Sequence, residues 1–256
     1  ALIAHGLHKG DKVALLMHNS IEMAVLIMAV AKAGGVLVPL SPLFDGAALA
    51  RMIERADVDY LFATQDNLAT IAGQAQMLHA LRDGGKIAVD FHAPGWLHYE
   101  VFTAGASTDE PAVTLRLDDV FNIMFTSGTT GDPKGAVHSH LSRLLYPLGW
   151  GAALGIDREA TVLLATPLYH NGTWITMLSA MHHGGKVVIL PKFDAARFMQ
   201  LVASERCTHS FVVPSQLIAI MQLDNFASYD TTSLEVVLTS GSPLPSSTFT
   251  AVQRGF

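Results

Sequence analysis

The chain has a single cysteine, Cys207, among its 256 residues. An internal disulfide is therefore excluded, and the composition fits a reducing compartment, so we expect a cytoplasmic protein. We predict that Cys207 is a small buried residue rather than a nucleophile. Charged residues are also scarce, at only 15% of the chain. The 16 Lys and Arg residues are fewer than the 22 Asp and Glu residues. Because the basic residues are few and scattered, we expect no nucleic-acid partner.

Long apolar runs are missing as well. The strongest candidate for a membrane span, Met23 to Leu40, contains Lys32, Gly34 and Gly35. These residues interrupt it well short of the roughly 20 apolar residues that a transmembrane helix needs, so we expect no transmembrane segment. The pattern instead predicts a buried helix that Ser20 caps and Gly34 ends, followed by a strand. No signal peptide is visible.

Short β-rich runs alternate with helical patterns along the chain. This alternation predicts an α/β fold with mostly parallel sheets flanked by helices. One of the predicted helices begins after Asp194, which caps it, and continues through Ser204. The predicted strands cover residues 13–17, 60–63, 162–165, 187–190, 211–213 and 236–238.

The segment from Gly95 to Pro111 is rich in small polar residues, which is typical of a loop. It is the best internal boundary in the sequence. We therefore predict a first α/β lobe over residues 1–104 and a second lobe over residues 105–256 that carries the phosphate-binding segment described next. The hydrophobic content of 50% is sufficient to bury the core of one large domain or of two lobes.

The most informative segment is the glycine- and hydroxyl-rich run from Thr126 to Gly135, which follows an apolar strand. Its three glycines let backbone N–H groups approach an anion, and Lys134 adds a compact positive charge. The Walker pattern does not fit, because Pro133 precedes the lysine and Gly135 follows it. The run therefore predicts a different phosphate-binding loop at the carboxyl end of a strand. Its candidate binding residues are Thr126, Ser127, Gly128, Thr129, Thr130, Gly131 and Lys134.

Residues 126–135 resemble the signature of the adenylate-forming enzymes, a family of acyl-CoA synthetases, luciferases and peptide-synthetase adenylation domains. Residues 7–40 are similar to the opening βαβ segment of that family. Residues 167–172, Pro-Leu-Tyr-His-Asn-Gly, resemble the Pro-Leu-Phe-His segment of its acyl-activating members. Residues 239–244 resemble its Ser-Gly-Gly-Ala-Pro loop, with Ser242 where a second glycine is common. The resemblance covers essentially the whole chain and implies the acyl-CoA synthetase/luciferase-like fold.

This resemblance implies an acid–thiol ligase that uses ATP, Mg²⁺ and CoA. A carboxylic acid, with a fatty acid favoured, becomes an acyl-adenylate and then a CoA thioester. The phosphate loop holds the β- and γ-phosphates, and Lys134 and His170 are the candidate catalytic residues. The resemblance places His170 between the nucleotide site and the acyl pocket. It places Ser240, Gly241, Ser242 and Pro243 against the adenine or the acyl group, although a plain strand-to-helix turn explains these four residues equally well.

Several family features do not occur before Phe256. They are a Tyr-Gly-x-Thr-Glu segment with a metal-binding glutamate, a ribose-binding aspartate, a hinge and a small C-terminal domain with a catalytic lysine. The chain also begins without methionine. We therefore expect an N-terminal fragment that is inactive alone, and we assign no metal ligand to it.

Two other functions stay open at this point. An ATP-dependent phosphotransferase would release ADP instead of AMP, and a non-catalytic nucleotide- or acyl-binding module would bind without turnover. The apolar residues from Trp174 to Met181 either line an acyl pocket or form an ordinary helix core. No acidic residue occurs from Leu168 through Trp174, which disfavours an amino acid as the substrate. The sequence leaves the acyl chain length, the choice between CoA and a carrier protein, and the oligomeric state undecided.

Overall fold

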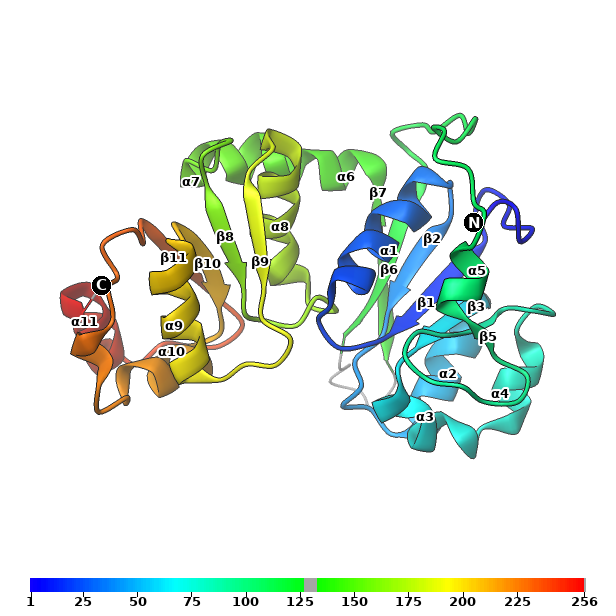
Figure 1. The fold of residues 1–256 in the computed structure, drawn as a ribbon, viewed down its shortest axis with the longest axis horizontal. Coiled ribbons are helices and arrows are strands. Elements are labelled where there is room, and N and C mark those ends of the chain that lie inside the picture. Colours follow the sequence, from blue (N-terminus) through cyan, green and yellow to red (C-terminus); the bar gives the residue numbers. More distant parts are fainter. Residues whose placement is uncertain (127–132, 256) are drawn as a thin grey trace. The chain divides into compact units, whose positions relative to one another are not determined.

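A computed structural model describes residues 1–126 and 133–255 of the chain. The chain divides into two compact units, Ala1–Ser142 and Arg143–Phe256 (Figure 1). This division differs from the boundary at residues 104 and 105 that the sequence predicted. The strands of residues 120–126 and 134–139 pair with the sheet of the first unit, which is why the segment after residue 104 belongs to that unit.

The first unit contains a seven-stranded sheet in the order β5-β4-β3-β1-β2-β6-β7. All of its pairs are parallel except the last, in which β6 and β7 run antiparallel. Its strands are β1 (Lys12–Leu16), β2 (Val36–Pro39), β3 (Val58–Ala63), β4 (Lys86–Ala88), β5 (Leu97–His98), β6 (Val120–Thr126) and β7 (Lys134–Ser139). Its helices are α1 (Ile21–Lys32), α2 (Gly46–Ala56), α3 (Gln65–Ala72), α4 (Ala75–Ala80) and α5 (Tyr99–Thr103).

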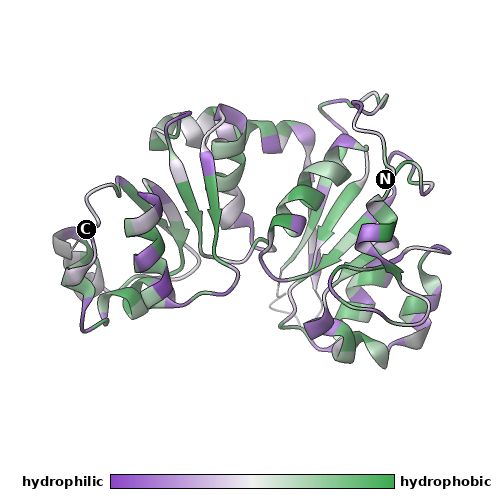
Figure 2. Ribbon diagram, in the orientation of Figure 1, coloured by the Kyte–Doolittle hydropathy of each residue, from purple (hydrophilic) through white to green (hydrophobic). Residues whose placement is uncertain are grey.

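The core of the first unit lies on both faces of the central strands, which are predominantly hydrophobic in Figure 2. The predicted cap of α1 is confirmed: the Ser20 hydroxyl accepts a hydrogen bond of 3.1 Å from the backbone N–H of Met23. The helix ends at Lys32, and Gly34 follows it with φ of +79°, a conformation that glycine adopts without strain. The predicted sequence of buried helix and strand over residues 23–40 is thus confirmed.

The second unit contains a four-stranded sheet in the order β11-β10-β8-β9, and all of its pairs are parallel. Its strands are β8 (Thr161–Leu164), β9 (Lys186–Ile189), β10 (His209–Val212) and β11 (Val236–Thr239). The helical segments from residue 140 onward are α6 (His140–Leu145), the π-helix η1 (Tyr146–Gly151), α7 (Ala152–Leu154), α8 (Asn171–His183), α9 (Ala195–Glu205), α10 (Pro214–Met221), the 3₁₀ helix η2 (Phe226–Ser228) and α11 (Ser246–Gly255).

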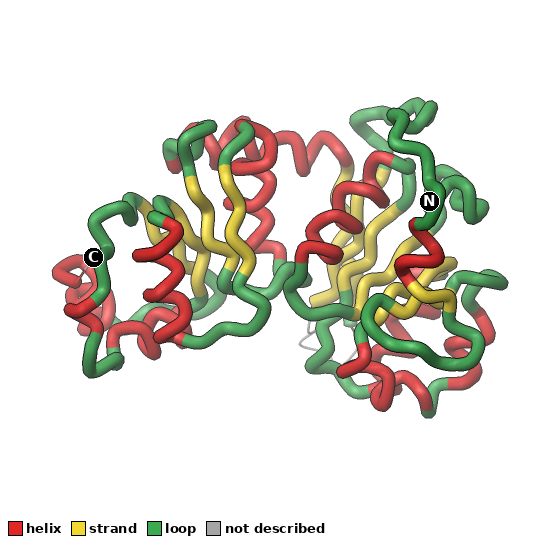
Figure 3. The backbone as a smooth tube through the Cα atoms, in the orientation of Figure 1, coloured by secondary structure: helices red, strands yellow, loops and turns green. Residues whose placement is uncertain are grey.

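Helices flank the strands of both units, as Figure 3 shows, and the predicted α/β class with mostly parallel sheets is confirmed. The predicted cap of α9 is also confirmed, because the Asp194 carboxylate accepts a hydrogen bond of 2.7 Å from the backbone N–H of Arg197. Cys207 is fully buried beside Leu201, and this burial raises the pKa of its thiol to about 11. The prediction of a small buried residue therefore holds. Among the described residues, no helix is both long and apolar enough to cross a bilayer.

Candidate functional site

The predicted phosphate loop connects β6 to β7. Thr126 ends β6, Lys134 begins β7, and the two residues face each other across the antiparallel pair. The Thr126 hydroxyl donates a weak hydrogen bond of 3.4 Å to the Lys134 carbonyl oxygen. The loop thus joins the one antiparallel pair described in a sheet whose other described pairs are parallel. The predicted binding residues Ser127, Gly128, Thr129, Thr130 and Gly131 lie outside the described residues.

The residues that end the predicted loop combine one buried residue with an exposed strand. Pro133 is buried, and its carbonyl oxygen accepts a hydrogen bond of 3.4 Å from Arg55 on α2. A Cβ on Gly135 would meet the side chain of Ile123 at 2.7 Å, so the absence of a side chain lets β7 lie close against β6. Lys134 itself is exposed. The Lys134 side chain is therefore accessible to solvent at the start of β7, near the end of the predicted loop.

The other predicted site residues gather at one edge of the second sheet. Because its strands are all parallel, the segments that follow β8 and β11 emerge at the same edge. The first of these segments carries His170 and the second carries Ser240, Gly241, Ser242 and Pro243. β10 lies between β8 and β11 in the sheet. Gly241 has φ of +100°, a backbone conformation that L side chains rarely adopt.

His170 occupies the N-cap position of α8. Its backbone N–H donates a hydrogen bond of 3.0 Å to the carbonyl oxygen of Pro167, and this bond closes a turn. The centroid of its ring lies 4.7 Å from the centroid of the Tyr169 ring. Although the residue is exposed overall, nearby protein atoms partly desolvate the ring and lower the pKa of His170 below its ordinary value. The neutral imidazole therefore prevails at pH 7, which suits a polar wall of a site better than a fixed cation.

Gly172 brings the first turn of α8 against the sheet. A Cβ at this position would lie 2.2 Å from the ring of Phe211, which is buried on β10. Only glycine permits this approach, so the residue type at position 172 sets how closely α8 packs at the edge that carries His170. Trp174, Met177 and Ala180 on the same helix have no exposed surface. For these three apolar residues the structure supports the helix-core interpretation.

A buried polar network that the sequence reasoning missed ties the end of β8 to the start of α10. The side-chain oxygen Oε1 of Gln216 accepts a hydrogen bond of 3.0 Å from the backbone N–H of Val213. The same oxygen lies 2.8 Å from the Thr166 hydroxyl oxygen. The Gln216 amide nitrogen Nε2 donates a hydrogen bond of 3.2 Å to the carbonyl oxygen of Ala165. The local signal was Pro214 at the first helical position with Gln216 at the third, a pattern typical of a capped helix start. The network holds the strand end from which the His170 segment emerges.

We expect Gln216→Leu to lower the free energy of unfolding of the second unit by about 1–3 kcal/mol, because Thr166 and two backbone groups lose buried partners. Hydrogen exchange measured by mass spectrometry on peptides covering residues 163–168 and 211–217 provides the test. Gln222→Leu is the matched control, since Gln222 is exposed at the other end of α10. Equal protection in both variants would contradict the stabilising role of the network.

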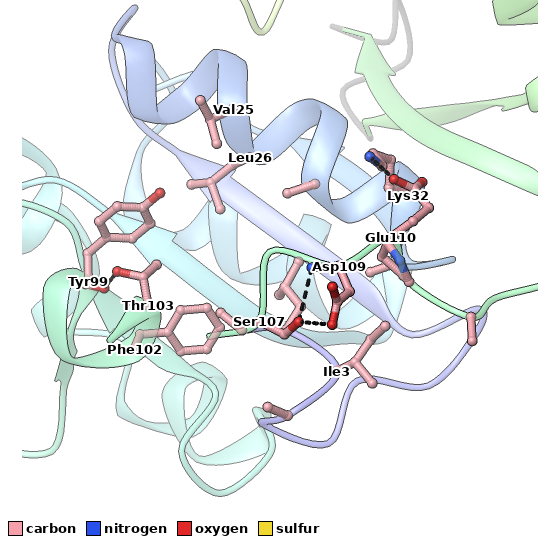
Figure 4. Close-up of a pocket in the computed structure, with 17 residues that line it drawn as sticks. Ile3, Val25, Leu26, Lys32, Tyr99, Phe102, Thr103, Ser107, Asp109 and Glu110 are labelled. Atoms are coloured by element: carbon pink, nitrogen blue, oxygen red, sulfur yellow. Dashed lines mark hydrogen bonds and ion pairs between the residues drawn. The ribbon is translucent and has the colours of Figure 1, made fainter. Parts of the chain in front are cut away.

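The first unit also contains an apolar pocket of about 580 Å³ (Figure 4), and none of the predicted site residues lines it. Val25, Leu26 and Phe102 line it together with the first four residues of the chain. Its rim carries an ion pair of 2.6 Å between Lys32 and Glu110, and these charges already satisfy each other. The pocket therefore presents apolar surface and lacks the converging donors that a phosphate requires.

The described parts of the chain contain no group of three or more His, Cys, Asp and Glu side chains arranged to hold a metal ion. Of the predicted loop oxygens, the structure describes the Thr126 hydroxyl, which by itself does not form a magnesium site.

The parallel α/β units define the fold class of acyl-CoA synthetase N-terminal domains. The inhibitor-bound crystal structure of the N-terminal domain of FACL13 from Mycobacterium tuberculosis matches with a TM-score of 0.86 at 28% identity, over 99% of this chain and 62% of that chain. The family model for AMP-binding enzymes matches residues 1–256. The chain therefore belongs to the AMP-binding enzyme family, as its motifs predicted.

Two curated relatives are CoA ligases. Long-chain-fatty-acid–CoA ligase FadD13 of Mycobacterium tuberculosis is 32% identical over 249 residues, which are 95% of this chain and 47% of that protein. Indoleacetate–CoA ligase of Aromatoleum aromaticum is 30% identical over an alignment of 263 residues that covers 99% of this chain and 50% of that protein. The chain thus spans about half the length of these relatives.

Proposed function

We propose that the complete protein joins a carboxylic acid to ATP, forming an acyl-adenylate and pyrophosphate, and then transfers the acyl group to CoA with release of AMP. The observation that carries the proposal is the Thr126–Gly135 signature between β6 and β7, in a chain that belongs to the AMP-binding enzyme family. The names of two relatives as CoA ligases support the same reaction.

In this reaction the phosphate loop has an electrostatic role. An acid carboxylate must approach the α-phosphorus of an anionic nucleotide, and negative charge develops on the departing pyrophosphate. Loop N–H groups and the Lys134 ammonium would stabilise this charge, together with Mg²⁺ on the phosphates.

For the acid we propose a substrate without an α-amino group, with a fatty acid favoured. The absence of acidic side chains from Leu168 through Trp174 supports this choice, because a buried ammonium would need a carboxylate partner. Partial desolvation lowers the pKa of His170 below its ordinary value, which is in agreement with an apolar acyl neighbour. The named acids of the two relatives differ, one a long-chain fatty acid and one an indole acid.

Acid-dependent ATP–pyrophosphate exchange by the complete gene product tests the proposal. The panel should contain fatty, aromatic and amino acids, and residues 1–256 alone should be assayed in parallel, where we expect no turnover. Exchange with one acid class would establish adenylation and identify the substrate. Formation of ADP without exchange would favour a phosphotransferase, and nucleotide binding without either product would favour a non-catalytic module.

We expect His170→Ala in the complete protein to change the order of preference among acids of different chain length. Removing the ring at the N-cap of α8 enlarges the space where the acyl group is proposed to enter, and selectivity between homologous acids follows from such contacts, at about 1–3 kcal/mol per methylene. The measurement is kcat/KM for a series of acids at saturating ATP. An unchanged order would argue against this position for His170.

A further inference from the structure

Arg143, in the last turn of α6, is a buried charge that the proposed reaction does not yet use. Only 3% of its surface is exposed. Its guanidinium carbon lies 4.9 Å from the centroid of the Tyr146 ring and 4.7 Å from that of Trp174. Its Nη1 donates a hydrogen bond of 2.7 Å to the side-chain oxygen of Asn171. Burying a guanidinium is costly, so contacts with two aromatic rings and an amide indicate a specific structural purpose.

Asn171, the acceptor, is the first residue of α8 and the direct neighbour of His170. Its side-chain amide also donates a hydrogen bond of 3.0 Å to the Tyr146 hydroxyl. Tyr146 is the first residue of the π-helix η1, which packs along α8. The Asn171 side chain is therefore held from two sides. Because α8 starts at this residue, holding its side chain also orients the first turn of the helix.

The other end of the His170 segment is anchored by the same helix. The Trp174 indole N–H donates a hydrogen bond of 2.7 Å to the carbonyl oxygen of Leu168. The Thr173 hydroxyl donates a hydrogen bond of 3.1 Å to the carbonyl oxygen of Pro167. Trp174 thus contacts Arg143 through its ring face and Leu168 through its N–H. His170 lies in the chain between Leu168, which Trp174 holds, and Asn171, which Arg143 holds. Because Trp174 also contacts Arg143, both ends of this short segment depend on Arg143.

We propose that Arg143 is a positioning residue for the acid-binding segment: through Asn171 and Trp174 it fixes residues 167–171, and with them the orientation of the His170 ring. This inference rests on the proposed function for its catalytic consequence. Lysine cannot replace arginine fully here, because an ammonium lacks the planar face that stacks between two rings.

The kinetic test compares Arg143→Met and Arg143→Lys in the complete protein, with Arg158→Met as the matched control because Arg158 is a surface residue of the same unit. For Arg143→Met we expect KM for the acid to rise about ten- to a hundredfold, the loss typical of a misplaced binding group, with KM for ATP nearly unchanged. Arg143→Lys should lie between wild type and Arg143→Met. Equal rises in both KM values, or none, would overturn the proposal.

A second readout is independent of activity. In Arg143→Met, hydrogen exchange of backbone amides 167–174 should accelerate, while exchange in α9 and β10 keeps its wild-type rate. Unchanged exchange at 167–174, or uniform acceleration over the whole second unit, would overturn the proposal. If the wild-type protein shows no acid-dependent activity, the proposed function fails, and the exchange pattern still decides whether Arg143 positions the segment.

Discussion

Lys134→Ala in the complete protein should lower the rate of acid adenylation about a hundred- to a thousandfold, the loss typical of removing one preorganised electrostatic group. The affinity for the acid should change much less. The reason is that Lys134 is exposed at the start of β7, near the end of the predicted phosphate loop. In the proposed reaction its charge acts on phosphate oxygens rather than on the acyl chain. Single-turnover formation of acyl-adenylate at varied acid concentration separates the two effects.

The control for Lys134 is Lys186→Ala. Lys186 begins β9, at the edge of the second sheet opposite to the His170 segment, and forms a surface ion pair of 2.6 Å with Glu205. An exposed pair of this kind contributes little to stability, so near-normal adenylation is expected. Equal losses of rate and acid affinity in Lys134→Ala would contradict its assignment to the phosphates.

Trp174→Ala should lower the free energy of unfolding of the second unit by about 3–5 kcal/mol, the usual cost of removing a buried tryptophan. Trp174 has no exposed surface, donates to the Leu168 carbonyl oxygen at 2.7 Å and contacts the Arg143 guanidinium. The variant leaves a cavity, a buried carbonyl oxygen without this donor and a guanidinium that has lost one of its rings. Urea titration with hydrogen exchange read on peptides of α8, α9 and α10 measures the change.

Trp174→Phe distinguishes packing from hydrogen bonding. Phenylalanine retains a ring beneath Arg143 but cannot donate to Leu168, so we expect a smaller loss of about 1–3 kcal/mol. A loss in Trp174→Phe as large as that in Trp174→Ala would mean that the indole N–H, rather than the ring, accounts for the stability. No loss in either variant would contradict the assignment of Trp174 to the core.

Much of the local structure followed from the sequence. The six predicted strands all form, and Ser20 and Asp194 cap their helices through side-chain hydrogen bonds to the third following N–H. Caps of this kind depend on residues within one turn, so they can be recognised in the printed order. The family was equally visible, because the Thr126–Gly135 motif is contiguous in sequence.

The limits of the units could not be found in this way. The loop predicted over Gly95–Pro111 was wrong over residues 97–103, where β5 and α5 form, whereas residues 104–111 are irregular. After them the chain returns to pair β6 with β2 at Leu37 and Asn122. Pairing between strands so far apart depends on the whole sheet, and local composition carries no trace of it. The antiparallel partner β7 was likewise unpredicted, since the alternation of helices and strands indicated mostly parallel sheets and did not indicate a strand directly after the phosphate loop.

The sequence by itself therefore determined the fold class, the family and the identity of the candidate residues, because each depends on neighbours along the chain. Tertiary structure decided which of them meet: parallel order in the second sheet brings the segments of His170 and Ser240–Pro243 to one edge. It also placed Arg143 between Tyr146 and Trp174. A buried arginine looks like any surface arginine in sequence, since only packing of distant elements removes it from water.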